Sequence, residues 1–323
     1  MASIRHQFSE LVRRGNIQTD RIEEALTVSL LRPDGAAWHR FLDHLFIWLG
    51  GLALAFAVLF FVAYNWNELG TITRFALIQV LIIAAIVGYW KLGTQKLAGK
   101  VSLLVASILV GVLLALYGQT YQTGADPWQL FFTWAMLVLP WALIGCFPAI
   151  WVMWVILINL SIVLYHQAFS GAFSVLFSPF TNMLWLLFAF NIVVLLLWEL
   201  AIHRWARLNE RWALRLVAVF AGLVITWLVL YDIVQYKDSQ VYPGLVWIGW
   251  IAAMLFVYLR VVRDLFMLAG ICLSAIVVVM VFVSRHLFNG DEAAAFLILA
   301  VMIIGMGAGA AVWLRHVYRG WQT

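Results

Sequence analysis

Charged residues are scarce in this sequence, and their scarcity decides its class. Only 11% of the 323 residues are Asp, Glu, Lys or Arg, whereas a soluble domain carries about 25%. Hydrophobic residues make up 65% of the chain, and its mean hydropathy is +0.98. This composition excludes a large soluble domain. It predicts an all-α, polytopic integral membrane protein that contacts the lipid bilayer along most of its length.

Cysteine and the common catalytic motifs are also scarce. The two cysteines, Cys146 and Cys272, lie far apart in apolar segments, so we expect neither a disulfide nor a metal site from them. The chain has no HExxH, GxSxG, Walker or CxxC motif. The seven histidines are scattered along it. The sequence therefore indicates no catalytic residue, no metal and no cofactor, and it favours a role other than catalysis.

Long apolar runs fill most of the chain, and each is about the length of a membrane-spanning helix. The predicted spans are residues 45–64, 73–91, 101–118, 128–146, 149–165, 180–202, 212–231, 243–262, 264–284 and 293–314. Residues 45–315 would then form a transmembrane bundle, and residues 316–323 a short tail. No apolar run lies near the start, so we expect no cleavable signal peptide and a first span that acts as an uncleaved signal.

The basic residues divide unequally between the two sides of this ten-span arrangement. Of the 20 Lys and Arg residues, only Arg74, Lys237 and Arg285 fall on one side. Short loops rich in Lys and Arg stay in the cytoplasm, so both termini are predicted to be cytoplasmic. The net charge of +5 follows from this distribution, and no nucleic-acid partner is expected.

The first 44 residues precede the spans and are polar. Apolar residues recur at helical spacing in residues 3–14 and again in residues 19–30, with a turn at residues 33–35. The pattern predicts a cytoplasmic hairpin of two amphipathic helices over residues 1–44. Such a hairpin would lie on the inner leaflet or dock a cytoplasmic partner.

Polar and aromatic residues gather in two predicted outer turns, at residues 64–70 and 117–128. Amides and carboxylates bind hydroxyl groups, and aromatic rings cover apolar sugar faces or acyl chains, so these turns suit a glycan or a lipid headgroup. Tyr and Trp also anchor helices at any membrane interface, and Asn, Gly and Asp make turns, so a purely structural interpretation stays open. The candidate ligand-binding residues are Tyr64, Asn65, Trp66, Glu68, Gln119, Tyr121, Gln122, Asp126 and Trp128.

Three segments resemble a known family. They are Tyr64–Trp66 (YNW), Gly118–Pro140 (GQTYQTGADPWQLFFTWAMLVLP) and Arg14–Ile17 (RGNI). In these segments the chain resembles the DUF2157 family of predicted bacterial membrane proteins, over about residues 1–145. The resemblance implies a multi-span protein of the bacterial inner membrane and supplies no activity.

A few polar or small residues inside the spans are predicted to serve helix packing. Asn159 and Asn191 fall near mid-depth on antiparallel neighbouring spans and could bond to each other. Gly305 and Gly309 form a small-xxx-small pattern in the last span. That pattern suits packing within the chain, a dimer seam or contact with another membrane protein.

Three hypotheses for function follow. The leading one is a non-enzymatic membrane component that binds a membrane or periplasmic partner protein, or an envelope lipid or glycan, through the outer turns. The second is a transporter or flippase for an amphipathic substrate. The third is an intramembrane transferase acting at the outer face, with Asp126, Glu68 or His286 as the base.

Overall fold

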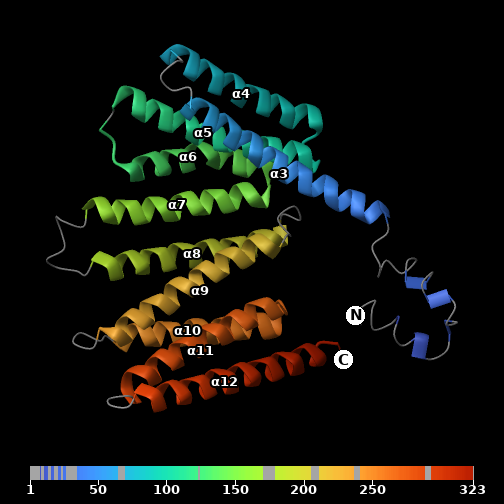
Figure 1. Ribbon diagram of the computed structural model, residues 1–323, viewed down its shortest axis with the longest axis vertical. Coiled ribbons are helices and arrows are strands. Elements are labelled where there is room, and N and C mark those ends of the chain that lie inside the picture. The colour runs from blue at the N-terminus through green and yellow to red at the C-terminus, as the bar shows by residue number, and fades with distance from the viewer. Residues whose placement is uncertain are drawn as a thin grey trace. The chain divides into compact units, whose positions relative to one another are not determined.

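Every regular element in the described part of the computed structural model is helical (Figure 1). The structure describes residues 35–64, 70–122, 124–169, 179–204, 211–235, 241–287 and 292–322, and scattered positions between residues 8 and 26. The helices are α3 (Gly35–Tyr64), α4 (Thr71–Leu92), α5 (Leu97–Tyr121), α6 (Pro127–Gly145), α7 (Pro148–Phe169), α8 (Pro179–Arg204), α9 (Arg211–Val234), α10 (Val241–Phe256), the π-helix η3 (Val257–Val261), α11 (Leu265–Leu287) and α12 (Glu292–Gly320). Within these residues, ten segments are long and apolar enough to cross a membrane. The prediction of an all-α, multi-pass membrane protein is confirmed.

The first span differs from its predicted boundaries. Helix α3 covers Gly35–Tyr64, so it contains the predicted span of residues 45–64 and begins ten residues before it. The extra turns hold polar side chains that bond to carbonyls of the helix itself. Arg40 Nε donates to the carbonyl of Ala36 at 3.3 Å, and His44 Nδ1 lies 2.6 Å from the carbonyl of Arg40. Most of the predicted hairpin of residues 1–44 lies outside the described residues, so it stays a prediction.

Two units make up the chain. The first, Met1–Thr123 with the last two residues, contains α3, α4 and α5. Helix α5 packs against both α3 and α4, and Ala55, Val101, Val105 and Leu109 form one of its cores. The turn between α4 and α5 is tight: a Cβ added at Gly99 would collide with the carbonyl oxygen of Gly93. Glycine at position 99 therefore lets α5 start against the end of α4.

The second unit, Gly124–Trp321, is a succession of antiparallel helices. Helices α6 and α7 form a hairpin whose turn depends on Cys146, in the left-handed conformation at φ 43°. The Cys146 amide donates to the carbonyl of Ala142 at 3.1 Å and so satisfies the end of α6. Helix α8 then packs on α7 and α9, and α11 packs on α9 and α12. The main core of the unit gathers residues of α7, α8, α9, η3 and α11.

Helix α10 ends in an unusual way. Its last turn widens into η3, in which Tyr258 is only 1% exposed. Arg263 follows at φ 44°, and Asp264 directly precedes α11. Single π turns inside helices are uncommon and often occur near functional residues. Only three residues separate the end of η3 from the beginning of α11.

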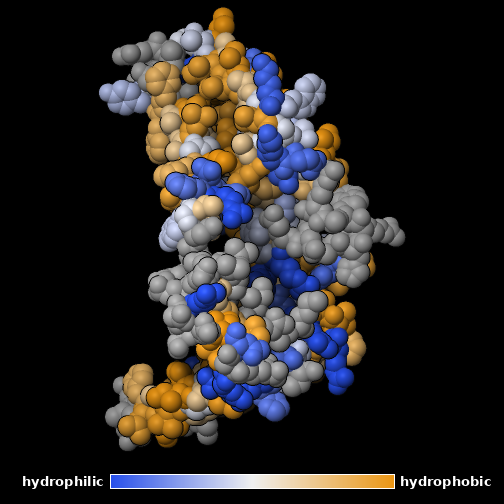
Figure 2. Space-filling view, turned by 90° about the vertical axis from the view of Figure 1, so that its right-hand side faces the viewer, coloured by the Kyte–Doolittle hydropathy of each residue, from blue (hydrophilic) through white to orange (hydrophobic). Residues whose placement is uncertain are grey.

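Basic side chains concentrate at one end of the helices in each unit, which we call the basic end. In the first unit it carries Lys91, Lys96 and Lys100, where α4 ends and α5 begins. In the second unit it carries Arg211, Arg215, Arg260 and Arg263. Figure 2 shows hydrophilic residues gathered among hydrophobic ones. The charge distribution predicts that this end faces the cytoplasm.

Candidate functional site

The first predicted outer turn is described only at its edges. Tyr64 ends α3 with 90% of its surface exposed. Asn65, Trp66 and Glu68 lie outside the described residues. Gly70 precedes α4 and accepts a hydrogen bond from the Arg74 amide at 3.1 Å. Tyr64 is thus the one candidate residue of this turn with a described position.

The second turn presents two tyrosine rings at the end of α5. Tyr117 and Tyr121 are one helical turn apart, and their ring centroids lie 4.8 Å from each other. The Tyr121 ring also lies 6.1 Å from that of Phe75 on α4. Both tyrosines stay more than half exposed, at 51% and 59%. The pair is therefore held by its neighbours and still open to a ligand.

Exposed amides flank these rings. Gln119 lies between the two tyrosines in sequence, and Gln122 follows α5 directly. Gln122 adopts the left-handed conformation at φ 43°, which ends the helix and turns the chain away. Amide groups donate and accept hydrogen bonds, so this helix end can bind hydroxyl groups next to aromatic faces. We call Tyr117, Gln119, Tyr121 and Gln122 the tyrosine–amide cluster.

The rest of the second turn belongs to the other unit and is tied into its packing. Asp126 precedes α6 and makes no side-chain cap, although its carbonyl accepts from the Gln129 amide at 3.0 Å. Trp128 is half-buried, and its ring lies 5.1 Å from that of Tyr165 on α7. Ser161 also donates to the Trp128 carbonyl at 3.2 Å. Trp128 therefore packs α6 against α7.

Asn159 and Asn191 lie together in the second unit, with exposures of 8% and 0%. Asn159 Nδ2 donates to Asn191 Oδ1 at 3.2 Å, and Asn191 Nδ2 donates to Asn159 Oδ1 at 2.6 Å. The second proton of each amide goes to a carbonyl one turn earlier, on Val155 and on Leu187, both at 2.8 Å. The two amides thus use all their donors on α7 and α8, and they line no polar groove.

The glycines of the last span have no close neighbour among the described residues. A Cβ added at Gly305 or Gly309 would find no atom within 4 Å. Large side chains beside them, such as Ile304, are also exposed. Among the described residues, no other helix of this chain packs closely against either glycine.

An ion pair at the basic end was not singled out from the sequence. Asp264 is 3% exposed and receives two hydrogen bonds from Arg215, each 3.1 Å long, through Nε and Nη2. Its Oδ1 also accepts the Phe266 amide at 3.1 Å, which caps the first turn of α11. Arg211 Nη1 lies 3.6 Å from the other oxygen. An Asp directly before an apolar run is a helix-start signal, and it was the available clue.

A second polar contact lies close by. The Tyr258 hydroxyl of η3 donates to Glu199 Oε1 of α8 at 3.4 Å. This contact links α8 to the end of α10.

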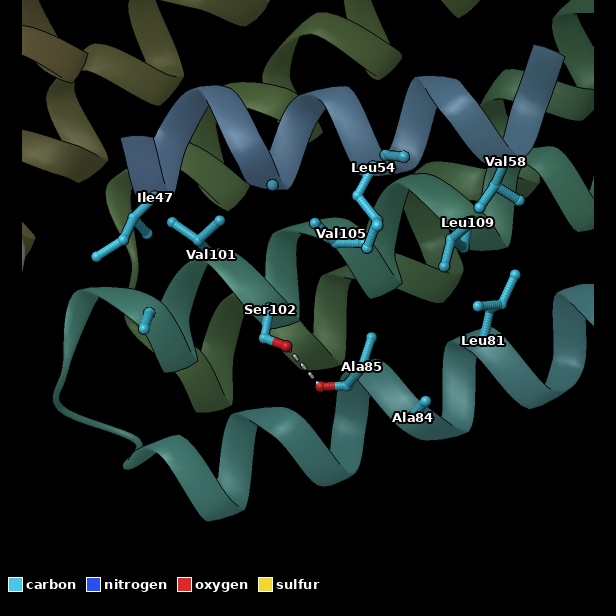
Figure 3. A pocket seen from close by; sticks show the side chains of 13 residues that line it. Ile47, Leu54, Val58, Leu81, Ala84, Ala85, Val101, Ser102, Val105 and Leu109 are labelled. Carbon is cyan, nitrogen blue, oxygen red and sulfur yellow. Dashed lines mark hydrogen bonds between the residues drawn. The ribbon is translucent and has the colours of Figure 1, made fainter. Parts of the chain in front are cut away.

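Each unit contains a mainly apolar cavity among its described residues. In the first unit it measures about 320 Å³ and lies between α3, α4 and α5. Figure 3 shows that Ser102 is the polar side chain among the labelled ones, and it donates to the Ala85 carbonyl at 3.1 Å. In the second unit the cavity measures about 620 Å³ and lies between α9, α10 and α11. The larger volume is within the range of small-molecule pockets, which is about 300–1,000 Å³.

Comparison with known proteins finds a family that matches the first part of the chain. Residues 9–151 match a family described as "Predicted membrane protein (DUF2157)". The resemblance to DUF2157 is confirmed. The DUF2157 match covers α3 to α6 and the tyrosine–amide cluster, whereas α8 to α12 lie beyond it. No curated protein and no solved structure matches the chain.

No group of three or more His, Cys, Asp or Glu residues that could hold a metal ion occurs among the described positions. The protein is a multi-pass membrane protein whose residues 9–151 match DUF2157.

Proposed function

We propose that the protein is a non-enzymatic membrane component that binds an envelope lipid or glycan through its outer turns. One observation carries the proposal: two half-exposed tyrosine rings lie 4.8 Å apart at the end of α5, with an exposed glutamine beside each. Rings cover the apolar faces of sugars or acyl chains, and amides bond to hydroxyls. The cluster thus combines the two properties that such a ligand requires.

The charge distribution supports placing this cluster outside the cytoplasm. It lies at the end of α5 opposite Lys96 and Lys100, and the positive side of a membrane protein is normally the inner one. An envelope ligand is reached from that outer side. The exposed Tyr64 at the end of α3 belongs to the same unit and adds a third ring for contact.

Transport receives less support from the geometry. A flippase needs a hydrophilic lateral groove, and the buried amides best suited to line one, Asn159 and Asn191, bond to each other and to backbone carbonyls. An outer-face transferase needs one indispensable acid or base. Its described candidate, Asp126, stands at the start of α6, and the candidates Glu68 and His286 have no described side chain.

The test is native mass spectrometry of the full chain released gently from its own membrane. We expect a lipid or glycan of discrete mass on the wild type and its loss when Tyr117→Ala and Tyr121→Ala are combined. Tyr318→Ala on α12 is the matched control, since this tyrosine is also exposed, at 45%, and lies outside the cluster. The ligand should also survive Asp126→Asn.

Three results would overturn the proposal. They are the absence of any lipid or glycan on the wild type, equal loss with the control variant, and loss caused by Asp126→Asn alone. A co-purifying protein in place of a small ligand would redirect the function to assembly with a partner.

A further inference from the structure

The 620 Å³ cavity of the second unit is lined by one face of α9, and the two arginines at the start of α9 lie on the same face. Its lining on α9 includes Ala218, Gly222, Thr226 and Leu230. These positions recur every four residues, which places them on one helix face. Arg215 lies on the same face, three residues before Ala218, and Arg211 lies one turn earlier. The apolar cavity therefore leads to a cationic end.

We propose that this face binds one anionic phospholipid, with an acyl chain in the cavity and the phosphate on Arg211 and Arg215. The length fits: the 12 steps of helix rise from Ala218 to Leu230 span about 18 Å, and one leaflet of hydrocarbon is about 15 Å thick. Basic pockets between transmembrane helices on the cytoplasmic side are suited to anionic headgroups. The site is separate from the tyrosine–amide cluster, so it stands independently of the proposed function.

The cavity opens toward lipid. Leu223 and Trp227 of α9 and Leu273 of α11 line it and stay 57–63% exposed. In a membrane protein, side chains exposed along the spans contact acyl chains. A chain can therefore enter sideways from the bilayer without crossing a polar barrier. The inner wall is closed by Trp250, whose ring packs so tightly on Gly222 that an added Cβ would lie 3.1 Å from it.

The two hydroxyl groups of the cavity wall, on Thr226 and Ser274, are already used within the protein. Thr226 Oγ1 donates to the Gly222 carbonyl at 2.6 Å and lies 2.6 Å from Ser274 Oγ. Because a hydroxyl has one proton, Ser274 must then donate to Thr226. Trp247 Nε1 in turn donates to Ser274 at 3.0 Å. With these donors satisfied, the surrounding surface is suited to a hydrocarbon chain rather than to a polar solute.

At the cationic end, Asp264 positions one arginine and leaves the other less constrained. Arg215 is fixed by its two hydrogen bonds to Asp264 and lies over the Phe266 ring, 5.4 Å from its centroid. Phe266 also lines the cavity, so it joins the ion pair to the acyl-chain region. Arg211 approaches Asp264 only to 3.6 Å, beyond hydrogen-bond distance, and its side chain is 38% exposed. Its guanidinium is therefore placed to contact a phosphate.

The surrounding charge favours an anion. The described charged side chains where α8 to α11 meet at this end are four cations and two carboxylates: Arg211, Arg215, Arg260, Arg263, Glu199 and Asp264. Glu199 is engaged by Tyr258 and Asp264 by Arg215. The net charge of this group of side chains is positive. It therefore favours a phospholipid with a negatively charged headgroup over one with a zwitterionic headgroup.

The experiment is a titration of the purified full chain in detergent micelles with phosphatidylglycerol or with phosphatidylcholine, in which native mass spectrometry counts bound lipids. We expect the first phosphatidylglycerol to bind more tightly than phosphatidylcholine. Arg211→Gln should weaken phosphatidylglycerol about fivefold, which corresponds to about 1 kcal/mol for one cation. Arg315→Gln, an exposed arginine on α12, is the matched control and should leave binding unchanged.

A second variant tests the cavity without changing charge. Gly270 lines the cavity, and a Cβ there would meet no atom within 4 Å, so Gly270→Leu fills the space without a clash at its Cβ. It should weaken both lipids, whereas Gly249→Leu on α10, which does not line the cavity, should weaken neither. Equal binding of the two lipids by the wild type, or identical effects of Arg211→Gln and Arg315→Gln, would overturn the headgroup assignment. Unchanged binding in Gly270→Leu would overturn the acyl-chain assignment.

Discussion

Replacing Asn159 or Asn191 with Leu perturbs a closed set of four hydrogen bonds in the middle of the second unit. Each amide gives one proton to the other and one to a carbonyl of its own helix, at distances of 2.6–3.2 Å. Either single substitution leaves the remaining amide with a donor and an acceptor unsatisfied, and exposures of 8% and 0% bring no solvent to replace them. Such a loss costs about 1–3 kcal/mol.

The double substitution behaves differently because it removes both partners. Two leucines leave no orphaned amide, so the double variant should be more stable than the sum of the single losses implies. Measured coupling between hydrogen-bonded side chains in membrane proteins averages about 0.6 kcal/mol and reaches about 1.7 kcal/mol. We expect a value in the upper half of that range, since two reciprocal bonds are lost together.

The assay is a double-mutant cycle on the free energy of unfolding, measured by reversible denaturation of the full chain in mixed micelles. The four proteins are the wild type, Asn159→Leu, Asn191→Leu and the double variant. Strictly additive losses would show that the two amides do not interact energetically, and the packing role assigned to them would then be rejected.

Three further predictions concern the ion pair, a tight turn and the topology. Asp264→Ala should lower the free energy of unfolding by about 3 kcal/mol, because it removes both the partner of Arg215 and the cap of α11. Asp264→Asn should retain the cap and therefore lose less stability. Equal losses in the two variants would argue against the cap. Gly99→Ala should lower thermal stability at a cost of about 1–3 kcal/mol, because the new methyl group meets the Gly93 carbonyl, and an unchanged melting temperature would contradict that close approach. A reporter fused after Gln122 should be external and one after Lys96 cytoplasmic, and the opposite reading at either position would reject the predicted orientation.

The spans could be predicted because hydropathy measures the property that the bilayer selects. The predicted ends of the spans were less accurate where polar residues continue a helix beyond its apolar segment. In α3 the side chains of Arg40 and His44 bond to backbone carbonyls of the same helix, so it begins ten residues before the predicted span. Average hydropathy cannot detect such local bonds.

Long-range pairing was harder to predict than the helices themselves. The Asn pair could be proposed because α7 and α8 are consecutive and antiparallel, so equal depth implies proximity. Arg215 and Asp264 are 49 residues apart on helices separated by α10, and only the packing of α11 on α9 brings them together. The cavity beside them was not predictable for the same reason, since its walls come from three helices.

The described amides and several described hydroxyls within the spans of the second unit bond inside the chain, and this constrains what the protein can do. The amides of α7 and α8, the hydroxyls of α9 and α11 and the Trp247 indole form hydrogen bonds within the chain. Chemistry that requires a free acid or base in the bilayer has little to use there. The groups that remain for ligands are at helix ends: exposed rings and amides at the end of α5 in the first unit, and arginines at the start of α9 in the second. Their position at helix ends favours a protein that holds lipids or glycans over one that moves a polar solute across the membrane.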